Sequence, residues 1–293
     1  MFSKFLDPKN DIAFRKIFGT KANKEILIHF LNDVIPFTGQ RPIVEVTFLP
    51  TVQDPEIAAQ KSSIVDVLCV DDQGATYIVE MQVARERGFE KRAQYYASKA
   101  YISQAEVGSE YHTLKEVIFL AIANFTMFKN KKSYKSDHVI LDFETHEHDL
   151  KDFSFTFIEL PKFHKTAKEL ESMADKWIYF FKHADETSEE ELAEISGKDE
   201  IIKKAYHELD RYYWTKEERH LYDQAEKHKN AYLASMAQKF DEGKAEGRDA
   251  VVRKMIEQRC EDSLIMSVAG ITAEQLSQLK GQSPTPLKMH KER

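Results

Sequence analysis

The first part of the chain is divided by a change in hydrophobic spacing. From Asp11 to Ile35 apolar side chains recur near the spacing of one helical face, and Pro36 follows directly. Because a proline disfavours helical backbone at the residue before it, we expect one amphipathic helix over residues 11–35, with Asp11 as its N-cap. Over Ile43–Leu49 the pattern changes to alternation between apolar and polar residues, which predicts a strand.

Two apolar runs separated by a polar tetrapeptide predict a β-hairpin. Ile64–Val70 and Ala75–Val83 are rich in β-branched residues, and Asp71–Gly74 between them has the composition of a turn. Gly74 stands where such a turn tolerates a positive φ angle. Further along, the spacing predicts a helix over Phe89–Gln104, a strand over Val117–Phe125, and a later pair of strands at Val139–Phe143 and Phe153–Leu160.

Beyond Pro161 the pattern is helical almost throughout. Gly243 and Gly247 would each weaken a helix by about 1 kcal/mol relative to alanine, so the longest predicted helix is open to a kink or break there. The elements together predict an α/β fold, in which helices flank a mixed β-sheet and a helical region follows. Helices are expected at Glu169–His183, after Ser188 as a cap within the acidic segment Asp185–Lys198, at Glu200–Tyr213, at Glu217–Gln258, and as a helix-turn-helix over Ser263–Leu279, with Gly270 as C-cap and Thr272 as N-cap.

The composition limits which classes of protein the chain can belong to. Hydrophobic residues make up 42% and charged residues 31%, which suits a packed core. The N-terminus lacks the apolar segment of a signal peptide, and no run of about 18 apolar residues exists, so we expect no membrane span. The two cysteines, Cys69 and Cys260, lie far apart, as is typical of a reducing compartment, and we expect a cytoplasmic protein.

The charge is negative in total but uneven along the chain. A formal net charge of −7 argues against a large basic surface for nucleic acid. Residues 85–99 nevertheless carry five basic side chains and residues 129–135 carry four, whereas acidic side chains gather over residues 185–200. Because charge acts locally, a basic face can bind phosphate while the whole chain stays negative.

The predicted hairpin places three polar side chains close together. If Val70 pairs with Thr76, Asp66 lies directly opposite Glu80. Gln82 is two residues beyond Glu80, so both side chains project from the same face of their strand. The register therefore predicts that Asp66, Glu80 and Gln82 converge on one small volume.

The surroundings of these side chains favour a metal ion. Their neighbours along the hairpin are apolar, and a buried carboxylate is unfavourable unless it is paired or bound to metal. Two carboxylates that meet across a hairpin also repel each other, and a divalent cation removes that conflict. Carboxylates on strands are more often solvent-facing, but no lysine or arginine lies between Ile64 and Val83 to pair with them. Hard oxygen donors favour Mg²⁺, with Ca²⁺ or Mn²⁺ as alternatives.

An ordered series of motifs resembles a nuclease family. A lysine, an aspartate five residues later, a D-x-x-G turn and I-V-E-M-Q are followed by R-x-x-x-Y and Y-x-x-L. This series resembles the Rpn-type recombination-promoting nucleases, a group also described as transposases of the PD-(D/E)xK superfamily. The similarity extends over residues 7–165. The matching residues are Lys61, Asp66, Gly74, Glu80, Met81, Gln82, Arg92, Tyr96, Tyr111 and Leu114, with D-x-x-F-x-K at Asp11, Phe14 and Lys16, and E-L-P-K-F at Glu159–Phe163.

The resemblance implies a metal-dependent DNA endonuclease on a restriction-endonuclease-like core. It implies that Asp66 and Glu80 hold Mg²⁺ together with the backbone carbonyl of Met81. Gln82 stands where the wider superfamily has lysine, and a neutral amide cannot supply a positive charge. Lys61 or Arg92 is our candidate for that charge, with Lys61, Asp66, Glu80 and Gln82 forming the predicted catalytic set.

The basic residues near this motif are candidates for DNA contact: Lys16, Arg85, Lys91, Arg92 and Lys99. For the basic residues within the helix predicted at 89–104, a solvent-exposed helix face explains the charge about as well as DNA contact does. The tyrosines of that helix suit core packing better than base stacking: Tyr95, Tyr96 and Tyr101. We also expect the histidines at 146 and 148 to lie in a solvated loop. No base-reading module is recognisable, so low sequence specificity is expected.

The sequence predicts four segments and leaves two other functions open. The segments are a nuclease core at 1–165, a helical extension at 166–258, a small helix-turn-helix-like unit at 259–280 and a disordered tail at 281–293. The family resemblance adds a role in recombination, mobile elements or phage defence. One alternative is a catalytically silent DNA-binding or regulatory protein; the other is an oligomerising protein, in which the C-terminal helices form a homodimer.

Overall fold

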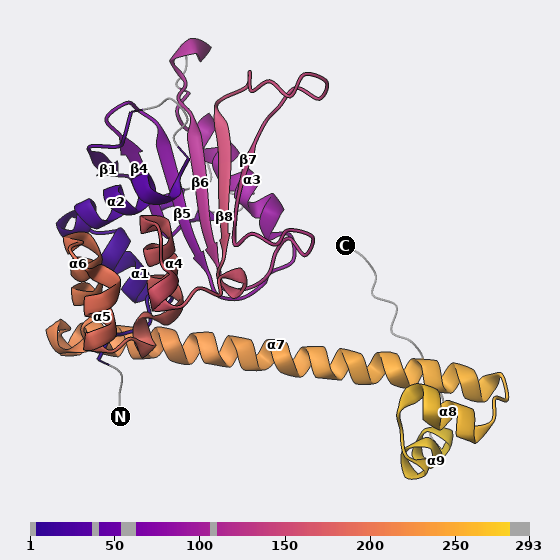
Figure 1. Cartoon of the computed structure of the whole chain (residues 1–293). Coiled ribbons are helices and arrows are strands. Elements are labelled where there is room, and N and C mark those ends of the chain that lie inside the picture. The colour runs from indigo at the N-terminus through magenta and orange to yellow at the C-terminus, as the bar shows by residue number, and fades with distance from the viewer. Residues whose placement is uncertain (1–3, 37–40, 54–62, 106–109, 282–293) are drawn as a thin grey trace. The chain divides into compact units, whose positions relative to one another are not determined.

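The computed structural model describes residues 4–36, 41–53, 63–105 and 110–281 of the chain (Figure 1). The chain divides into two compact units, Met1–Glu226 and Lys227–Arg293. Within the described residues, none of the helices combines the length and the apolar character needed to cross a bilayer. The predicted disordered tail falls almost wholly on residues 282–293, which lie outside the described residues.

A six-stranded mixed sheet forms the centre of the first unit. Its strand order is β1-β4-β5-β6-β8-β7, in which β5, β6 and β8 are parallel and the other neighbours pair antiparallel. This is the predicted α/β architecture, a mixed sheet flanked by helices and followed by a helical region. The strands are β1 (Val46–Phe48), β4 (Val67–Asp71), β5 (Thr76–Gln82), β6 (Val117–Ala123), β7 (Lys135–Val139) and β8 (Phe153–Glu159), beside a separate two-stranded ribbon of β2 (Val52–Gln53) and β3 (Ser63–Ile64).

The turn between β4 and β5 fixes the register of the hairpin. Asp71 Oδ1 accepts hydrogen bonds from the backbone N–H groups of Gln73 and Ala75, at 2.8 and 2.9 Å. Gly74 adopts a φ angle of 91°, which side chains with a Cβ rarely tolerate. Val70 therefore faces Thr76, as predicted, and the paired residues continue to Val67 opposite Val79, one step before Asp66.

The predicted helix over residues 11–35 is wrong in one respect, because it is two helices. α1 (Asp11–Phe18) ends at Gly19, and α2 (Lys24–Val34) begins after a short 3₁₀ turn at Lys21–Asn23. Thr20 has extended backbone, which breaks the helical hydrogen-bond ladder. The N-cap is also Asn10 rather than Asp11, since the Asn10 side chain accepts the N–H of Ile12 at 2.9 Å.

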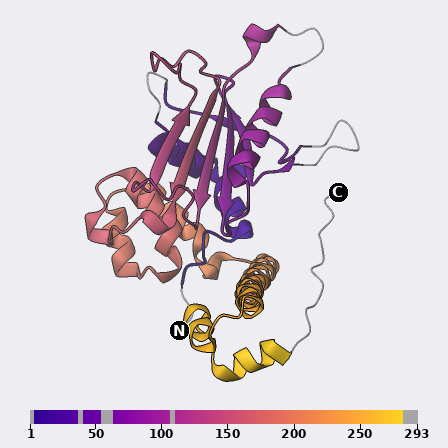
Figure 2. The same ribbon diagram turned by 90° about the vertical axis from the view of Figure 1, so that its right-hand side faces the viewer.

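Each face of the sheet is covered by different helices (Figures 1 and 2). On one face, α1, α2 and α4 (Met173–His183) share an aromatic cluster in which Phe30 packs on Trp177 and Phe181 at ring separations of 5.5 and 5.3 Å. On the other face, α3 (Phe89–Ile102) places Phe89 and three alanines against the strands. Truncating a buried aromatic of the cluster to alanine would cost about 3–5 kcal/mol.

The remaining helices of the first unit follow the predicted order. α4 begins at Met173 rather than Glu169, because Ser172 caps it by accepting the N–H of Asp175. Ser188 caps α5 (Glu189–Ser196) as predicted, and α6 (Glu200–Leu209) follows. The predicted strand Val139–Phe143 is shifted, because β7 ends at Val139 and pairs with β8 through Lys135–Val139.

α7 (Lys216–Glu257) is one helix, without a break at Gly243 or Gly247. Strong helix formers surround both glycines, so the weakening of about 1 kcal/mol at each does not end the helix. In the second unit, α8 (Asp262–Ala269) and α9 (Ala273–Gly281) pack on the end of α7 around Val252, Ile265, Ile271 and Leu276. The Gly270 cap of α8, at a φ angle of 62°, and the Thr272 cap of α9 are as predicted. The four predicted segments stay predictions.

Candidate active site

The three polar residues of the hairpin lie at one end of the sheet. Asp66 directly precedes β4, and Glu80 and Gln82 occupy the last three positions of β5 together with Met81. Met81 packs into the core beneath α1 and α2, so alternation along the strand turns Glu80 and Gln82 toward the α3 face. Glu80 is only 3% exposed, which places a carboxylate in a largely apolar layer.

Hydrogen bonds connect these residues without satisfying all of them. The N–H of Met81 donates to Asp66 Oδ2 at 2.9 Å, and Gln82 Nε2 donates to Glu80 Oε2 at 3.2 Å. Glu80 Oε1 is buried and has no hydrogen-bond partner among the described residues. Because buried carboxylate oxygens are nearly always satisfied, this atom needs an additional partner.

The electrostatics point to the same need. Burial raises the pKa of Glu80 to about 8, and the nearby negative charge of Asp66 adds to this rise, while Arg92 opposes it. Burial also raises the pKa of Asp66; the N–H of Met81 lowers it, Asp11 raises it and Arg15 lowers it. The net shift of both pKa values is upward, so the cations near these two carboxylates do not offset burial and the neighbouring negative charges.

A divalent cation fits this donor set. Mg²⁺ prefers hard oxygen ligands. This site offers the unpartnered Oε1 of Glu80, the carboxylate of Asp66, and carbonyl and amide oxygens of β5. The described residues contain no group of three or more His, Cys, Asp or Glu arranged to hold a metal. A metal at this position would thus take two carboxylates from the chain and complete its shell with neutral oxygens.

Arg15 is a functional candidate that sequence reasoning missed. It projects from α1, and its Nη2 lies 3.3 Å from Asp66 Oδ1. Asp11, one turn earlier on α1, is near enough for its charge to raise the pKa of Asp66. The available signal was the D-x-x-F-x-K motif, because Arg15 lies inside it between Phe14 and Lys16.

The two predicted sources of the missing positive charge have different outcomes. Lys61 lies outside the described residues. Arg92 lies on α3, where its guanidinium stacks 5.0 Å from the centroid of the Phe89 ring and pairs with Glu86 at 2.5 Å. Its charge lowers the pKa of Glu80, so Arg92 acts on the carboxylate from the α3 side.

The predicted DNA contacts are not all brought together. Lys91 and Arg92 line one cavity at the start of α3, and Arg85 is exposed on the loop before it. Lys99 lies about two turns further along α3. Lys16 lies elsewhere, with its ammonium 2.5 Å from Glu218 Oε1 and 4.6 Å from the Trp214 ring centroid, where it attaches α1 to the start of α7.

The E-L-P-K-F motif forms a buried ion pair beside the site. Glu159 is fully buried at the end of β8, and its Oε2 lies 2.6 Å from Lys162 Nζ. Glu159 Oε1 accepts the N–H of Met127 and of Phe128, which follow β6. Since Gln82, Ala123 and Glu159 are in register across the parallel strands, this pair holds the loop next to the end of β5.

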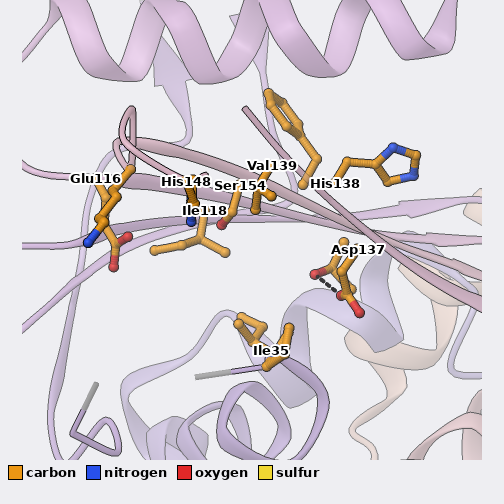
Figure 3. Close-up of a pocket in the computed structure, with 12 residues that line it drawn as sticks. Ile35, Glu116, Ile118, Asp137, His138, Val139, His148 and Ser154 are labelled. Carbon is orange, nitrogen blue, oxygen red and sulfur yellow. Dashed lines mark hydrogen bonds between the residues drawn. The ribbon is translucent and has the colours of Figure 1, made fainter. Parts of the chain in front are cut away.

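A second cavity, of about 450 Å³, lies away from these carboxylates (Figure 3). Ile118, Ser154 and Asp137 line it on the face of the sheet opposite to Glu80, where Asp137 accepts a hydrogen bond from Thr156 at 2.8 Å. His148 lines it as well, whereas His146 is exposed on the preceding loop. The cavity combines acidic, basic and apolar side chains, and no single ligand chemistry follows from it.

Comparison with protein families gives one match. The family described as PD-(D/E)XK nuclease family transposase matches residues 8–237. Comparison with curated proteins and with solved structures gives no match. The matched region contains the six-stranded sheet, the Asp66–Glu80–Gln82 cluster and the first half of α7.

Proposed function

Because the chain belongs to the PD-(D/E)XK nuclease family of transposases, we propose that it is a Mg²⁺-dependent DNA endonuclease with Asp66 and Glu80 as its metal ligands. The observation that carries the proposal is the buried, unpartnered Oε1 of Glu80 beside a second carboxylate. PD-(D/E)XK nucleases generally use divalent metals, and a buried pair of carboxylates with one unsatisfied oxygen suits such an ion.

In this mechanism the chain's own residues prepare the site for the ion and the DNA phosphate. When bound, Mg²⁺ supplies Lewis acidity toward the phosphate and a water of lowered pKa. The backbone N–H of Met81 donates to Asp66 and orients that carboxylate. The backbone carbonyl of Met81 is the proposed third ligand of the metal. Gln82 orients Glu80 through its amide N–H, which leaves the amide oxygen to position a water.

The positive charge that Gln82 cannot supply comes, in this proposal, from two arginines. Arg15 lies beside Asp66 and Arg92 acts on Glu80, so each carboxylate has a cation on its outer side. Such cations stabilise the anionic form of the ligands and the negative charge that develops on the phosphate. Lys61 stays a further candidate for this role.

The proposed partner is DNA, cleaved with low sequence specificity in the cytoplasm. The loop before α3 and the helix itself carry the basic residues that are proposed to contact phosphates: Arg85, Lys91, Arg92 and Lys99. The family description as a transposase supports a role in recombination or mobile elements, with phage defence as the alternative.

We also propose that two copies of the chain pair through α7. Tyr232, Met236 and Phe240 are spaced by four residues, lie along one side of the helix and are 43%, 42% and 71% exposed. Analytical ultracentrifugation of the full chain and of Phe240→Ser tests this. A dimer that dissociates more readily in the variant supports the pairing, and a monomeric wild type refutes it.

The test of the nuclease function is conversion of supercoiled plasmid to nicked circles with Mg²⁺ and with EDTA. The expected result is nicking that requires Mg²⁺ and that falls by at least roughly a hundredfold in Glu80→Ala, as expected when a ligand of a catalytic metal is lost. Mg²⁺-dependent nicking that Glu80→Ala retains at the wild-type rate would place the chemistry elsewhere.

A further inference from the structure

A cavity of about 430 Å³ opens at the start of α3. The loop after β5 enters it through Gly88, whose φ angle of 83° turns the chain into the helix. A Cβ at Gly88 would meet nothing within 4 Å, so the approach is open on this side. Its volume lies within the range of about 300–1,000 Å³ that is typical of ligand sites.

The lining of this cavity combines basic side chains with aromatic rings, and its one carboxylate, Glu86, pairs with Arg92. Arg87 and Lys91 are exposed basic side chains at its rim. Tyr95 is 44% exposed, and its ring lies 6.1 Å from that of Tyr96 at an interplanar angle of 53°. Ring faces stack on nucleobases of any identity, and basic side chains pair with the phosphates that connect them. This combination fits a nucleotide better than an apolar ligand.

Two residues that line the cavity, Arg92 and Tyr96, lie on α3, the helix that covers the face of the sheet toward which Glu80 points. Arg92 lies 5.9 Å from the centroid of the Tyr96 ring, and both residues line the cavity. Both also interact with Glu80, because the positive charge of Arg92 lowers the pKa of that carboxyl and the charge of Glu80 raises the pKa of Tyr96. The cavity therefore lies on the same side of the sheet as Glu80.

We propose that this cavity binds a DNA nucleotide that has left the base stack, with its base on Tyr95 and its phosphate on Arg87 and Lys91. The favoured substrate is then DNA with single-stranded character, such as ends, flaps and bubbles. This inference rests on the proposed nuclease function. A base inside an intact duplex cannot reach the ring of Tyr95, whereas an unpaired base stacks there without an unpairing penalty.

The charge of the protein supports the same substrate. Affinity for duplex DNA comes mainly from neutralised phosphates, and in a chain with a net charge of −7 the basic side chains of residues 85–99 form a local patch rather than a surface long enough to follow a duplex. Stacking does not depend on net charge, so the tyrosine gives a single strand an affinity that the duplex does not share.

The test is fluorescence anisotropy with a labelled 20-nucleotide single strand and with the matching duplex, measured in EDTA so that neither is cleaved. Tyr95→Ala is expected to weaken single-strand binding about tenfold, the usual loss for one stacked base, and to change duplex binding less than twofold. Tyr95→Phe keeps the ring and should bind like wild type. Tyr212→Ala, which removes a tyrosine that is 87% exposed and lies outside the cavity, is the matched control.

The outcomes separate this inference from the nuclease proposal. Unchanged single-strand binding in Tyr95→Ala, or an equal loss for both DNAs, overturns the nucleotide site even if Mg²⁺-dependent nicking is found. Selective loss of single-strand binding in Tyr95→Ala supports the site even if no DNA is cleaved, in which case only the nuclease proposal fails. Loss in Tyr95→Phe equal to that in Tyr95→Ala would also overturn it, because the hydroxyl rather than the ring would then bind.

Discussion

Replacing Glu80 by glutamine should stabilise the metal-free protein at high pH. The side chain is 3% exposed and lies beside Asp66, so its charged form is unfavourable in the fold. Burial, together with Asp66, raises the pKa from an ordinary 4.5 to about 8. Between these values the folded state keeps a proton that the unfolded state has lost, and stability therefore falls as the pH rises from about 4.5 to about 8.

The size of this effect follows from the difference in pKa. Each unit corresponds to about 1.4 kcal/mol, so the charged carboxylate destabilises the fold by up to about 5 kcal/mol above pH 8. Glutamine is never charged and can still accept the hydrogen bond from Gln82. Its amide N–H₂ would occupy the position of the unpartnered Oε1, which costs about 1–3 kcal/mol if it stays unpaired. A net gain of about 2–4 kcal/mol is expected at pH 9.

Urea unfolding in EDTA at pH 5, 7 and 9 measures this gain. At pH 5 the charge penalty of the wild type is only about 1 kcal/mol, so the unpaired amide should leave Glu80→Gln less stable by up to about 2 kcal/mol, and Glu80→Gln should become the more stable protein as the pH rises. Added Mg²⁺ should stabilise the wild type, since a ligand that binds only the folded state shifts its free energy of unfolding, and should leave the variant unchanged. Parallel stability curves from pH 5 to pH 9, or a less stable Glu80→Gln at pH 9, would show that the charge of Glu80 does not destabilise the fold.

Three further predictions follow from particular contacts. Lys162→Met leaves the fully buried Glu159 without its ion-pair partner and should lower the free energy of unfolding by about 3–5 kcal/mol, whereas the double variant with Glu159→Gln should recover most of the lost stability. An unchanged urea midpoint in Lys162→Met contradicts this. Arg15→Ala should slow Mg²⁺-dependent nicking roughly tenfold while Arg15→Lys keeps most of the rate, because only the alanine variant loses the cation beside Asp66. Equal nicking rates for Arg15→Ala and the wild type would remove Arg15 from the mechanism. Gly74→Ala should destabilise the protein by about 1–2 kcal/mol, because φ is 91° and the new Cβ would lie 3.1 Å from Lys115 Cγ, whereas Gly247→Ala should stabilise its helix by about 1 kcal/mol. Thermal unfolding followed by circular dichroism compares the two variants, and a Gly74→Ala protein more stable than Gly247→Ala contradicts the prediction.

The hairpin could be predicted from the sequence because its information is local. The Asp71–Gly74 turn fixes the register of two flanking apolar strands, and the register in turn brings Glu80 next to Asp66. The elements that were misplaced depend on weaker local signals. Gly19 and Thr20 break a helix whose hydrophobic spacing continues on both sides, and the polar strand Lys135–Val139 is less apolar than the residues that follow it.

The parts of the site that were missed depend on contacts between distant segments. Arg15 and Asp66 are 51 residues apart, and only the packing of α1 against the sheet brings them together. The sequence motif contained Arg15 but did not indicate which way its side chain points. The sequence favoured core packing for Tyr95, Tyr96 and Tyr101, and Tyr96 and Tyr101 do pack against the core under α3, whereas Tyr95 is 44% exposed and lines a cavity.

DNA hydrolysis with a metal held by Asp66 and Glu80 can be measured by plasmid nicking with a matched aspartate control. Wild type, Asp66→Ala and Asp72→Ala are purified by one route and assayed with Mg²⁺; Asp72 is an exposed residue of the turn in the same hairpin. We expect Mg²⁺-dependent nicking by wild type and Asp72→Ala and its loss in Asp66→Ala. Equal nicking by all three proteins, or none by the wild type, would contradict it.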